Sequence, residues 1–257
     1  MATQSAALSL VALGGVPMVV PGANLADTVI NALVASTETL RDGDIVVLAQ
    51  KIVSKAEGRA VPLADITPSP AALDLASQCD KDPRLVELIL SESQAVMRVR
   101  PGVLIVRHRL GLVLANAGID QSNIDQSGGP VALLLPRDPD ESCLQLRAAL
   151  HERTGIDAAV LIIDSFGRAW RNGTTGTAIG VSGMAGLLDL RGAPDLHGRR
   201  LETSELGLAD EVAAAASLIM GQGNEGRPIV LVRGLSHDRR DGSAGELIRA
   251  PQLDLFP

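Results

Sequence analysis

Apolar residues along the chain follow two patterns: some recur at the spacing of one helix face, and others form short continuous runs. The helical spacing predicts four helices. Asn24 can cap the first, while Asp82-Pro83 and Asp138-Pro139 can open the second and third, because aspartate is a good N-cap and proline is tolerated in the first turn. The predicted helices run from Leu25 to about Leu40, from Pro83 to about Val96, from Pro139 to a stop at Gly155, and from Leu208 to Met220.

The short apolar runs between these helices predict strands. Val103–Val106 and Leu110–Leu114 are predicted to form a hairpin, and Ala158–Ile163 is the clearest strand of the chain. The other predicted strands are Asp44–Ala49, Val131–Leu135 and Ile229–Val232. Helices and strands mix without regular βαβ spacing, which favours an α+β fold with two lobes. The glycine-rich segment Arg168–Arg200 lacks periodicity and is predicted to be a long functional excursion rather than a packed element.

The composition excludes several classes of protein. With aromatic residues at 1% and a net charge of −7, the chain lacks both the stacking platforms and the basic field of nucleic-acid-binding proteins. Cys79 and Cys143 lie in no metal-ligand pattern and are expected to be buried thiols. No apolar run approaches the ~18 residues of a membrane span, and the uncharged N-terminal segment lacks the basic start of a secretory signal. We therefore expect a soluble cytoplasmic protein with no nucleic-acid or membrane partner.

Lysine is scarce, and two of the three lysines lie in the segment Gln50–Arg59, directly after a predicted strand. If the strand continues, alternation places Lys51, Val53 and Lys55 on one side of it. Lysine is a compact point charge that suits phosphate. The alternative is a pair of exposed lysines on an edge strand.

Three further polar segments are candidates for chemistry. In Ala115–Asn123, Asp120 could bind a hard cation and Asn123 a phosphate or hydroxyl, although capped loops look similar. In Ile162–Arg168, Asp164 and Ser165 follow an apolar strand, as oxygen ligands of Mg²⁺ or Mn²⁺ often do, unless the aspartate caps a following helix.

Nearby, Arg168 and Arg171 could pair with anions. The third segment, Met220–Pro228, has glycines at 221, 223 and 226 that would let backbone N–H groups approach a ligand; a helix C-cap and turn is the alternative. The four histidines are scattered and are expected to be surface or hydrogen-bonded structural residues.

Together these segments closely resemble the coenzyme F420-0:γ-glutamyl ligase family. The resemblance extends from about Gly15 to Phe256 and is carried, in family order, by QKIVSKAEGR, KDPRLVELIL, ANAGIDQSN, LLPRDPDES, IDSFGRAWRNGTTGTAIG, DLRGAPDLHGR, ADE, MGQGNEG and SAGELIRAPQLDLF. It implies one ligase domain over residues 1–257, built from two interleaved α+β subdomains in an intertwined homodimer, without the fused C-terminal flavin domain of some relatives.

The resemblance also implies an activity and a site. The activity is GTP-dependent amide formation between L-glutamate and the terminal carboxylate of a coenzyme F420 precursor, through an acyl phosphate, followed by further γ-linked glutamates. Two divalent cations per subunit, Mg²⁺ or Mn²⁺, and a monovalent cation such as K⁺ would assist. The implied metal ligands are Asp120 and Asp164 for one divalent cation, with Ser165 and Gln222 on a second one. The implied GTP-binding residues are Val16, Pro17, Met18, Val19, Gln50, Lys55, Asn123, Gly221, Gln222, Gly223, Asn224, Glu225 and Gly226.

Lys55 is also expected to act on the phosphates, and Arg168 and Arg171 are candidates for holding a carboxylate. The chain departs from the family at Ala23-Asn24 and at Asn224, where acidic residues are expected, so the outer nucleotide contacts are less defined. Two other functions remain open from the residues alone: a metal- and nucleotide-dependent phosphotransferase or nucleotidase, and a regulatory nucleotide-binding module.

Overall fold

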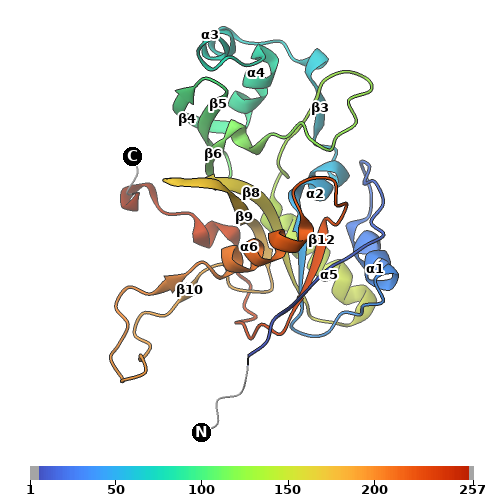
Figure 1. The fold of residues 1–257 in the computed structure, drawn as a ribbon, viewed down its shortest axis with the longest axis vertical. Helices are drawn as coiled ribbons and strands as arrows, with labels where there is room; N and C mark the ends of the chain where they lie inside the picture. Colours follow the sequence, from blue (N-terminus) through green and yellow to red (C-terminus); the bar gives the residue numbers. More distant parts are fainter. Residues whose placement is uncertain (1–5, 255–257) are drawn as a thin grey trace.

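The centre of the molecule is a five-stranded mixed sheet (Figure 1). A computed structural model describes residues 6–254. The strands are β1 (Ser9–Ala12), β2 (Ile45–Ala49), β8 (Ala159–Arg168), β9 (Arg171–Ser182) and β12 (Ile229–Arg233), in the order β1-β12-β2-β8-β9. Only β2 and β8 pair in parallel; the other neighbours are antiparallel.

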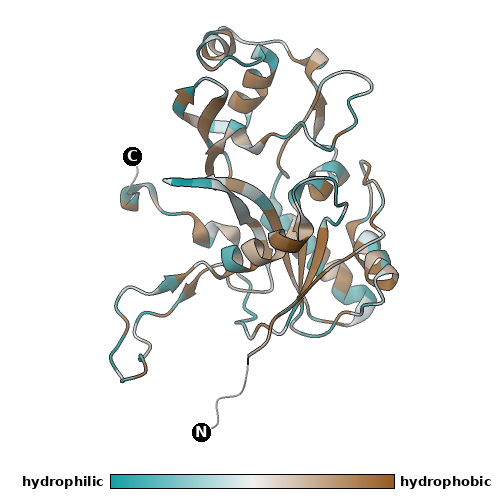
Figure 2. Cartoon of the chain, in the orientation of Figure 1, coloured by the Kyte–Doolittle hydropathy of each residue, from teal (hydrophilic) through white to brown (hydrophobic). Residues whose placement is uncertain are grey.

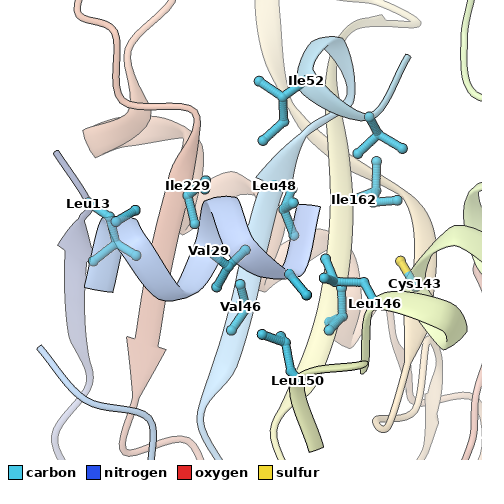
Figure 3. Close-up of a cluster of buried hydrophobic side chains, with 14 of the residues drawn as sticks. Leu13, Val29, Val46, Leu48, Ile52, Cys143, Leu146, Leu150, Ile162 and Ile229 are labelled. Atoms are coloured by element: carbon cyan, nitrogen blue, oxygen red, sulfur yellow. The ribbon is translucent and has the colours of Figure 1, made fainter. Parts of the chain in front are cut away.

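Helices cover both faces of this sheet. On one face, Val46 and Leu48 of β2 pack with α1 (Leu25–Ala35) and α5 (Pro139–Thr154) (Figure 3). On the other face, Ile45 and Val47 belong to the core that includes α6 (Leu208–Met220). Alternation along a strand sends successive side chains to opposite faces, so both faces of β2 are apolar because both are covered. Figure 2 shows hydrophobic residues along the strands at the centre of the sheet and hydrophilic residues toward the outer end of the β8–β9 hairpin.

The chain leaves the sheet after β2 and builds a second, smaller lobe before it returns through α5 (Figure 1). A three-stranded antiparallel sheet and two helices share one apolar core there. They are α3 (Pro70–Cys79), α4 (Pro83–Ser91), β4 (Ser93–Arg100), β5 (Val103–His108) and β6 (Val113–Ala115). The short strands β3 (Ala60–Pro62) and β7 (Val131–Leu133) pair beside it, and 3-10 turns lie at Leu63–Asp65, Asn116–Gly118, Ala244–Leu247 and Pro251–Leu253. The mixed helices and separate sheets confirm an α+β fold.

An ionic network lies at the base of the smaller lobe. Arg59 Nη2 and Arg109 Nε contact the Glu92 carboxylate at 2.8 Å and 3.0 Å. The same two arginines donate to the main-chain oxygens of Leu135 and Pro136, just before α5. Burial opposes ionisation of Glu92, but His108 and the two arginines outweigh it and lower the pKa of Glu92 to about 2. The network therefore joins the smaller lobe to the chain that re-enters the main sheet.

The structure confirms most predicted elements and corrects others. The second strand of the predicted hairpin spans Val113–Ala115 rather than Leu110–Leu114. The first helix ends at Ala35 rather than about Leu40, and α4 ends at Ser91, after which the chain forms strand β4 instead of continuing as helix to Val96. The excursion predicted from Arg168 to Arg200 is wrong over its first part, since Arg171–Ser182 pairs along β8 as a strand of the main sheet. Irregular chain lies mainly between the short paired strands β10 (Leu188–Asp189) and β11 (Glu205–Leu206), which project from the body (Figure 1).

The prediction also missed β1, β3 and α3. Within residues 6–254, no helix is long and apolar enough to cross a membrane. Cys79 and Cys143 are free, buried thiols, as predicted. Phe256, where the family resemblance ends, lies outside the described residues.

Candidate functional site

The lysine segment forms a helix, which corrects the prediction of a continued strand. Residues Gln50–Ala56 are α2, which begins directly where β2 ends at Ala49. Lys51 and Lys55 still share a face, but the reason is the helical spacing of four residues rather than strand alternation. The turn from strand to helix at Ala49 brings both lysines to one end of the sheet.

The four polar segments singled out in the sequence meet in one cavity of about 790 Å³. This volume is in the range of small-molecule sites. The cavity is bounded by α2, the loop after Gly118, the middle of β8 and the glycine loop that follows α6, here defined as Gly221–Gly226. The sequence-predicted residues that line it are Val16, Pro17, Met18, Val19, Gln50, Lys55, Asp120, Asn123, Asp164, Ser165, Gly221, Gln222, Gly223, Asn224, Glu225 and Gly226.

Hydrogen bonds join these segments across long stretches of sequence. Lys51 Nζ lies 2.6 Å from Oδ2 of Asp120 and donates to Oγ of Ser122 at 2.7 Å. Lys55 Nζ donates to the main-chain oxygen of Asn123 at 2.8 Å. The Asn123 amide in turn donates to the main-chain oxygen of Gly223 at 3.1 Å. The loop that carries Asp120 is thus held between α2 and the glycine loop.

The two carboxylates of the cavity have different environments. Burial alone would raise the pKa of Asp120, but Lys51 and the N–H of Ser122 outweigh it, and the pKa is lowered. The pKa of Asp164 is raised to about 6, first by burial and then by the charge of Asp120. Asp164 lies within β8 and caps no helix, so the alternative interpretation of this aspartate is wrong.

The donor set fits a hard divalent cation. Asp120, Asp164, Ser165 and Gln222 offer carboxylate, hydroxyl and amide oxygens, which Mg²⁺ and Mn²⁺ prefer. In the described part of the chain, Asp164 forms no ion pair with a basic side chain, and a bound cation would offset the cost of its ionised form. No group of three or more His, Cys, Asp or Glu side chains suited to a metal occurs among residues 6–254, so other oxygen donors would complete the coordination.

Other groups that line the same cavity suit an anion. Gly221 has a φ of 81° and ends α6, so the helix-cap interpretation of the glycine loop is correct, and the loop lines the cavity as well. The backbone N–H of Gly223 donates to the Glu225 carboxylate at 2.8 Å, which shows that this N–H can hold an anionic oxygen. The buried Gln50 lines the same cavity, and its Nε2 has no hydrogen-bond partner within the described residues. The pKa of Lys55 is lowered, first by burial and then by the positive charge of the nearby Lys51, while the charge of Asp120 acts in the opposite direction.

Two predicted site residues do not join this cavity. Arg168 and Arg171 form the last cross-strand pair of the β8–β9 hairpin and are exposed, and neither lines the cavity. The cavity wall reaches Thr174, one cross-strand pair earlier. None of the four histidines lines it either, as expected. Asn24, one of the departures from the family pattern, caps α1 by accepting from the N–H of Asp27 at 3.0 Å.

The sequence prediction left some lining residues without a role. The most important are Lys51 and Ser122, because both contact Asp120 directly. The spacing of Lys51 and Lys55 by four residues was the available signal, and it was obscured by treating the segment as a strand. The other lining residues without a predicted role include Ile124, Asp125, Ser217 and Arg227.

The fold and the cavity define a two-lobed α+β protein whose cavity, at one end of the main sheet, is lined by acidic, basic and glycine-rich segments. Residues 15–234 match the family model of the F420-0:γ-glutamyl ligases, and the chain belongs to this family. It is 47% identical over 251 residues to a coenzyme F420:L-glutamate ligase of Methanothermobacter thermautotrophicus, covering 97% of this chain and 98% of the relative. Proteins of the same name in Methanopyrus kandleri and Archaeoglobus fulgidus are 44% and 39% identical, over 92% and 94% of this chain and 92% and 93% of the relatives.

Proposed function

We propose that this protein is a GTP-dependent ligase that joins L-glutamate to the terminal carboxylate of a coenzyme F420 precursor and then adds further γ-linked glutamates. Family membership and the names of the relatives support the substrate class. The observation that carries the proposal is the meeting of Asp120, Asp164, Lys55 and the glycine loop in one cavity. A metal–nucleotide complex requires oxygen donors for the cation together with N–H groups and cationic side chains for the phosphates.

Amide formation from a free carboxylate needs activation. In the proposed reaction, a carboxylate oxygen of the precursor attacks the γ-phosphorus of GTP, the bond to GDP breaks, and an acyl phosphate forms. The amino nitrogen of glutamate then attacks the acyl carbon, phosphate leaves, and the amine releases a proton. When bound at Asp120, Asp164, Ser165 and Gln222, divalent cations would neutralise charge on the phosphate oxygens.

The chain's own residues have distinct tasks in this proposal. Lys55 and the glycine loop hold the phosphates, with one compact charge and with backbone N–H groups. Gln50 can donate its unpaired Nε2–H to an acceptor of the nucleotide. Arg168 and Arg171 remain proposed carboxylate contacts, for a substrate that extends from the cavity along the β8–β9 hairpin. Water must be kept from the acyl phosphate, because it would hydrolyse the intermediate.

The decisive test is mass spectrometry of the products. The purified protein is incubated with GTP, Mn²⁺ and the F420 precursor, with and without L-glutamate. A product heavier by glutamyl residues, formed only with glutamate and accompanied by GDP, is the expected result. Phosphate release that ignores glutamate and gives no heavier product would favour the phosphotransferase or nucleotidase, and tight nucleotide binding without turnover would favour a regulatory module.

Three further expectations belong to the same proposal: a single ligase domain, an intertwined homodimer and activation by a monovalent cation such as K⁺. Size-exclusion chromatography with light scattering measures the molar mass in solution and so tests the dimer directly. Replacing K⁺ by Na⁺ at constant ionic strength tests the monovalent cation, and a lower rate in Na⁺ is the expected result.

A further inference from the structure

The ammonium group of Lys51 already neutralises one of the two carboxylates proposed to bind the divalent cation. It contacts Oδ2 of Asp120 at 2.6 Å, while the N–H of Ser122 donates to Oδ1 of the same carboxylate at 2.7 Å. Both oxygens of Asp120 are therefore engaged within the chain. The side chains of Lys51 and Asp120 are 25% and 28% exposed, so water screens this ion pair only in part.

A divalent cation cannot share Oδ2 with this ammonium without repulsion. A cation bound to a carboxylate oxygen lies about 2–2.6 Å from it, and the lysine nitrogen occupies the space beside the same oxygen. Two positive charges so close repel each other strongly in a partly shielded site. The ammonium group of Lys51 therefore opposes binding of the cation at Asp120, and movement of Lys51 away from the carboxylate favours it.

Lys51 has an alternative anionic partner available in the same cavity. It precedes Lys55 by one helical turn on the same face of α2, and the glycine loop lines the same cavity. The four-carbon stem of lysine lets its ammonium group change partner while the backbone stays in place. Phosphate oxygens held by Lys55 and the glycine loop would attract it.

We propose that Lys51 is a positioning residue: its ammonium group holds Asp120 until nucleotide phosphates draw the ammonium group away. The divalent cation then takes the place of the ammonium group beside Asp120. This inference rests on the cation site of the proposed function. It makes metal and nucleotide binding mutually reinforcing, beyond the direct contact of metal with phosphate, because binding of either one favours the same position of Lys51. It also predicts that the protein without nucleotide binds the metal weakly.

The test measures binding rather than turnover. Nucleotide-free protein is titrated with Mn²⁺, and free Mn²⁺ is followed by electron paramagnetic resonance. Lys51→Gln should bind Mn²⁺ about fivefold or more tightly than the wild type, in line with the loss of one partly shielded competing ion pair. With a saturating non-hydrolysable GTP analogue, this gain should disappear.

Two controls separate the exchange from a general charge effect. Lys51→Arg keeps a cation beside Asp120. Lys81→Gln makes the same change in net charge as Lys51→Gln, but in the smaller lobe. The Mn²⁺ affinity of both variants should stay within about twofold of the wild type, as expected for substitutions that leave the competing ion pair intact. Unchanged or weaker Mn²⁺ binding by folded Lys51→Gln overturns the proposal, and Lys51→Met gives the same measurement if the glutamine variant does not fold. Asp120→Asn tests the cation site itself: if it binds Mn²⁺ like the wild type, the site assignment fails independently of Lys51.

Discussion

The hydroxyl of Ser165 donates a hydrogen bond to Oε1 of Gln222 at 2.8 Å, across 57 positions of sequence. Ser165 belongs to β8, and Gln222 lies in the glycine loop after α6. The bond therefore fastens that loop to the central sheet. It also brings together the two residues that the family resemblance implies for a second cation.

We expect Ser165→Ala and Gln222→Ala each to weaken Mn²⁺-dependent use of GTP by about tenfold, roughly 1.4 kcal/mol. Either change removes both a candidate ligand and the bond that positions the other one. The double variant should therefore lose less than the sum of the single effects. Initial rates over a range of Mn²⁺ concentrations measure this, and strictly additive effects would show that the two residues act separately.

Local signals in the sequence were enough for much of the fold. The apolar run Ala158–Ile163 predicts the first half of β8, and the Asp138-Pro139 and Gly155 signals predict both ends of α5, because caps act within a few residues. Strand β9 was missed because its glycines and threonines carry no clear period. Its conformation depends on pairing with β8, which a local pattern does not report.

Local patterns also predicted part of the site, but not the contacts between segments that are distant in the sequence. Apolar runs that end in polar residues marked the segments of Asp120 and Asp164, and the motif resemblance grouped them with the glycine loop. The Lys51–Asp120 ion pair joins residues whose closeness follows from the turn at Ala49 and from the path of the smaller lobe. Only the three-dimensional arrangement reveals such a contact.

Asp164→Asn should abolish turnover and leave the fold intact, because the amide keeps the shape of the side chain but loses the charge that holds the cation. Asp120→Asn should behave likewise, and the two effects should be non-additive if both serve one metal cluster. Rate measurements with a circular dichroism spectrum as the check on folding are sufficient. Full activity in a folded Asp164→Asn protein would remove Asp164 from the site.

The raised pKa of Asp164 predicts that Asp164→Asn, although inactive, stabilises the metal-free protein. The pKa rises from its usual 3.8 to about 6 on folding, so ionisation costs free energy in the folded state. The free energy of unfolding should thus decrease as the pH rises from about 4 through 6. Asp164→Asn should be more stable than the wild type by about 1–3 kcal/mol at pH 7.5 and nearly equal to it at pH 4. Urea titrations in the presence of a chelator measure the difference, and saturating Mn²⁺ should reverse it.

Glu92 should show the opposite pH dependence. Its pKa is lowered from 4.5 to about 2 in the folded protein, so its contribution to stability is present above pH 4.5 and is lost as the pH falls toward 2. Glu92→Gln should lower the free energy of unfolding by about 2–3 kcal/mol at pH 7, and the difference should shrink below pH 4.5. Exposed Glu152→Gln is the matched control and should change it by less than about 0.5 kcal/mol. A difference that stays constant down to pH 2.5 would contradict the ionic role of Glu92.

The last prediction separates a phosphate contact from a surface charge at Lys55. This lysine is partly buried, and its Nζ is held by the main-chain oxygen of Asn123 at 2.8 Å. If it binds the phosphates of GTP, Lys55→Arg should reduce the use of GTP by about tenfold or more, roughly 1.4 kcal/mol, because the planar guanidinium is bulkier and cannot place one compact charge at the same point.

Lys51 cannot serve as the control for this substitution, because it contacts Asp120. Lys81, between α3 and α4 in the smaller lobe, offers the same change of side chain away from the cavity, and Lys81→Arg should leave kcat/KM for GTP within about twofold. The steady-state rate as a function of GTP concentration distinguishes the two variants. Equal and small effects at both positions would remove Lys55 from the nucleotide site, whereas the proposed ligase activity would still stand on the product analysis.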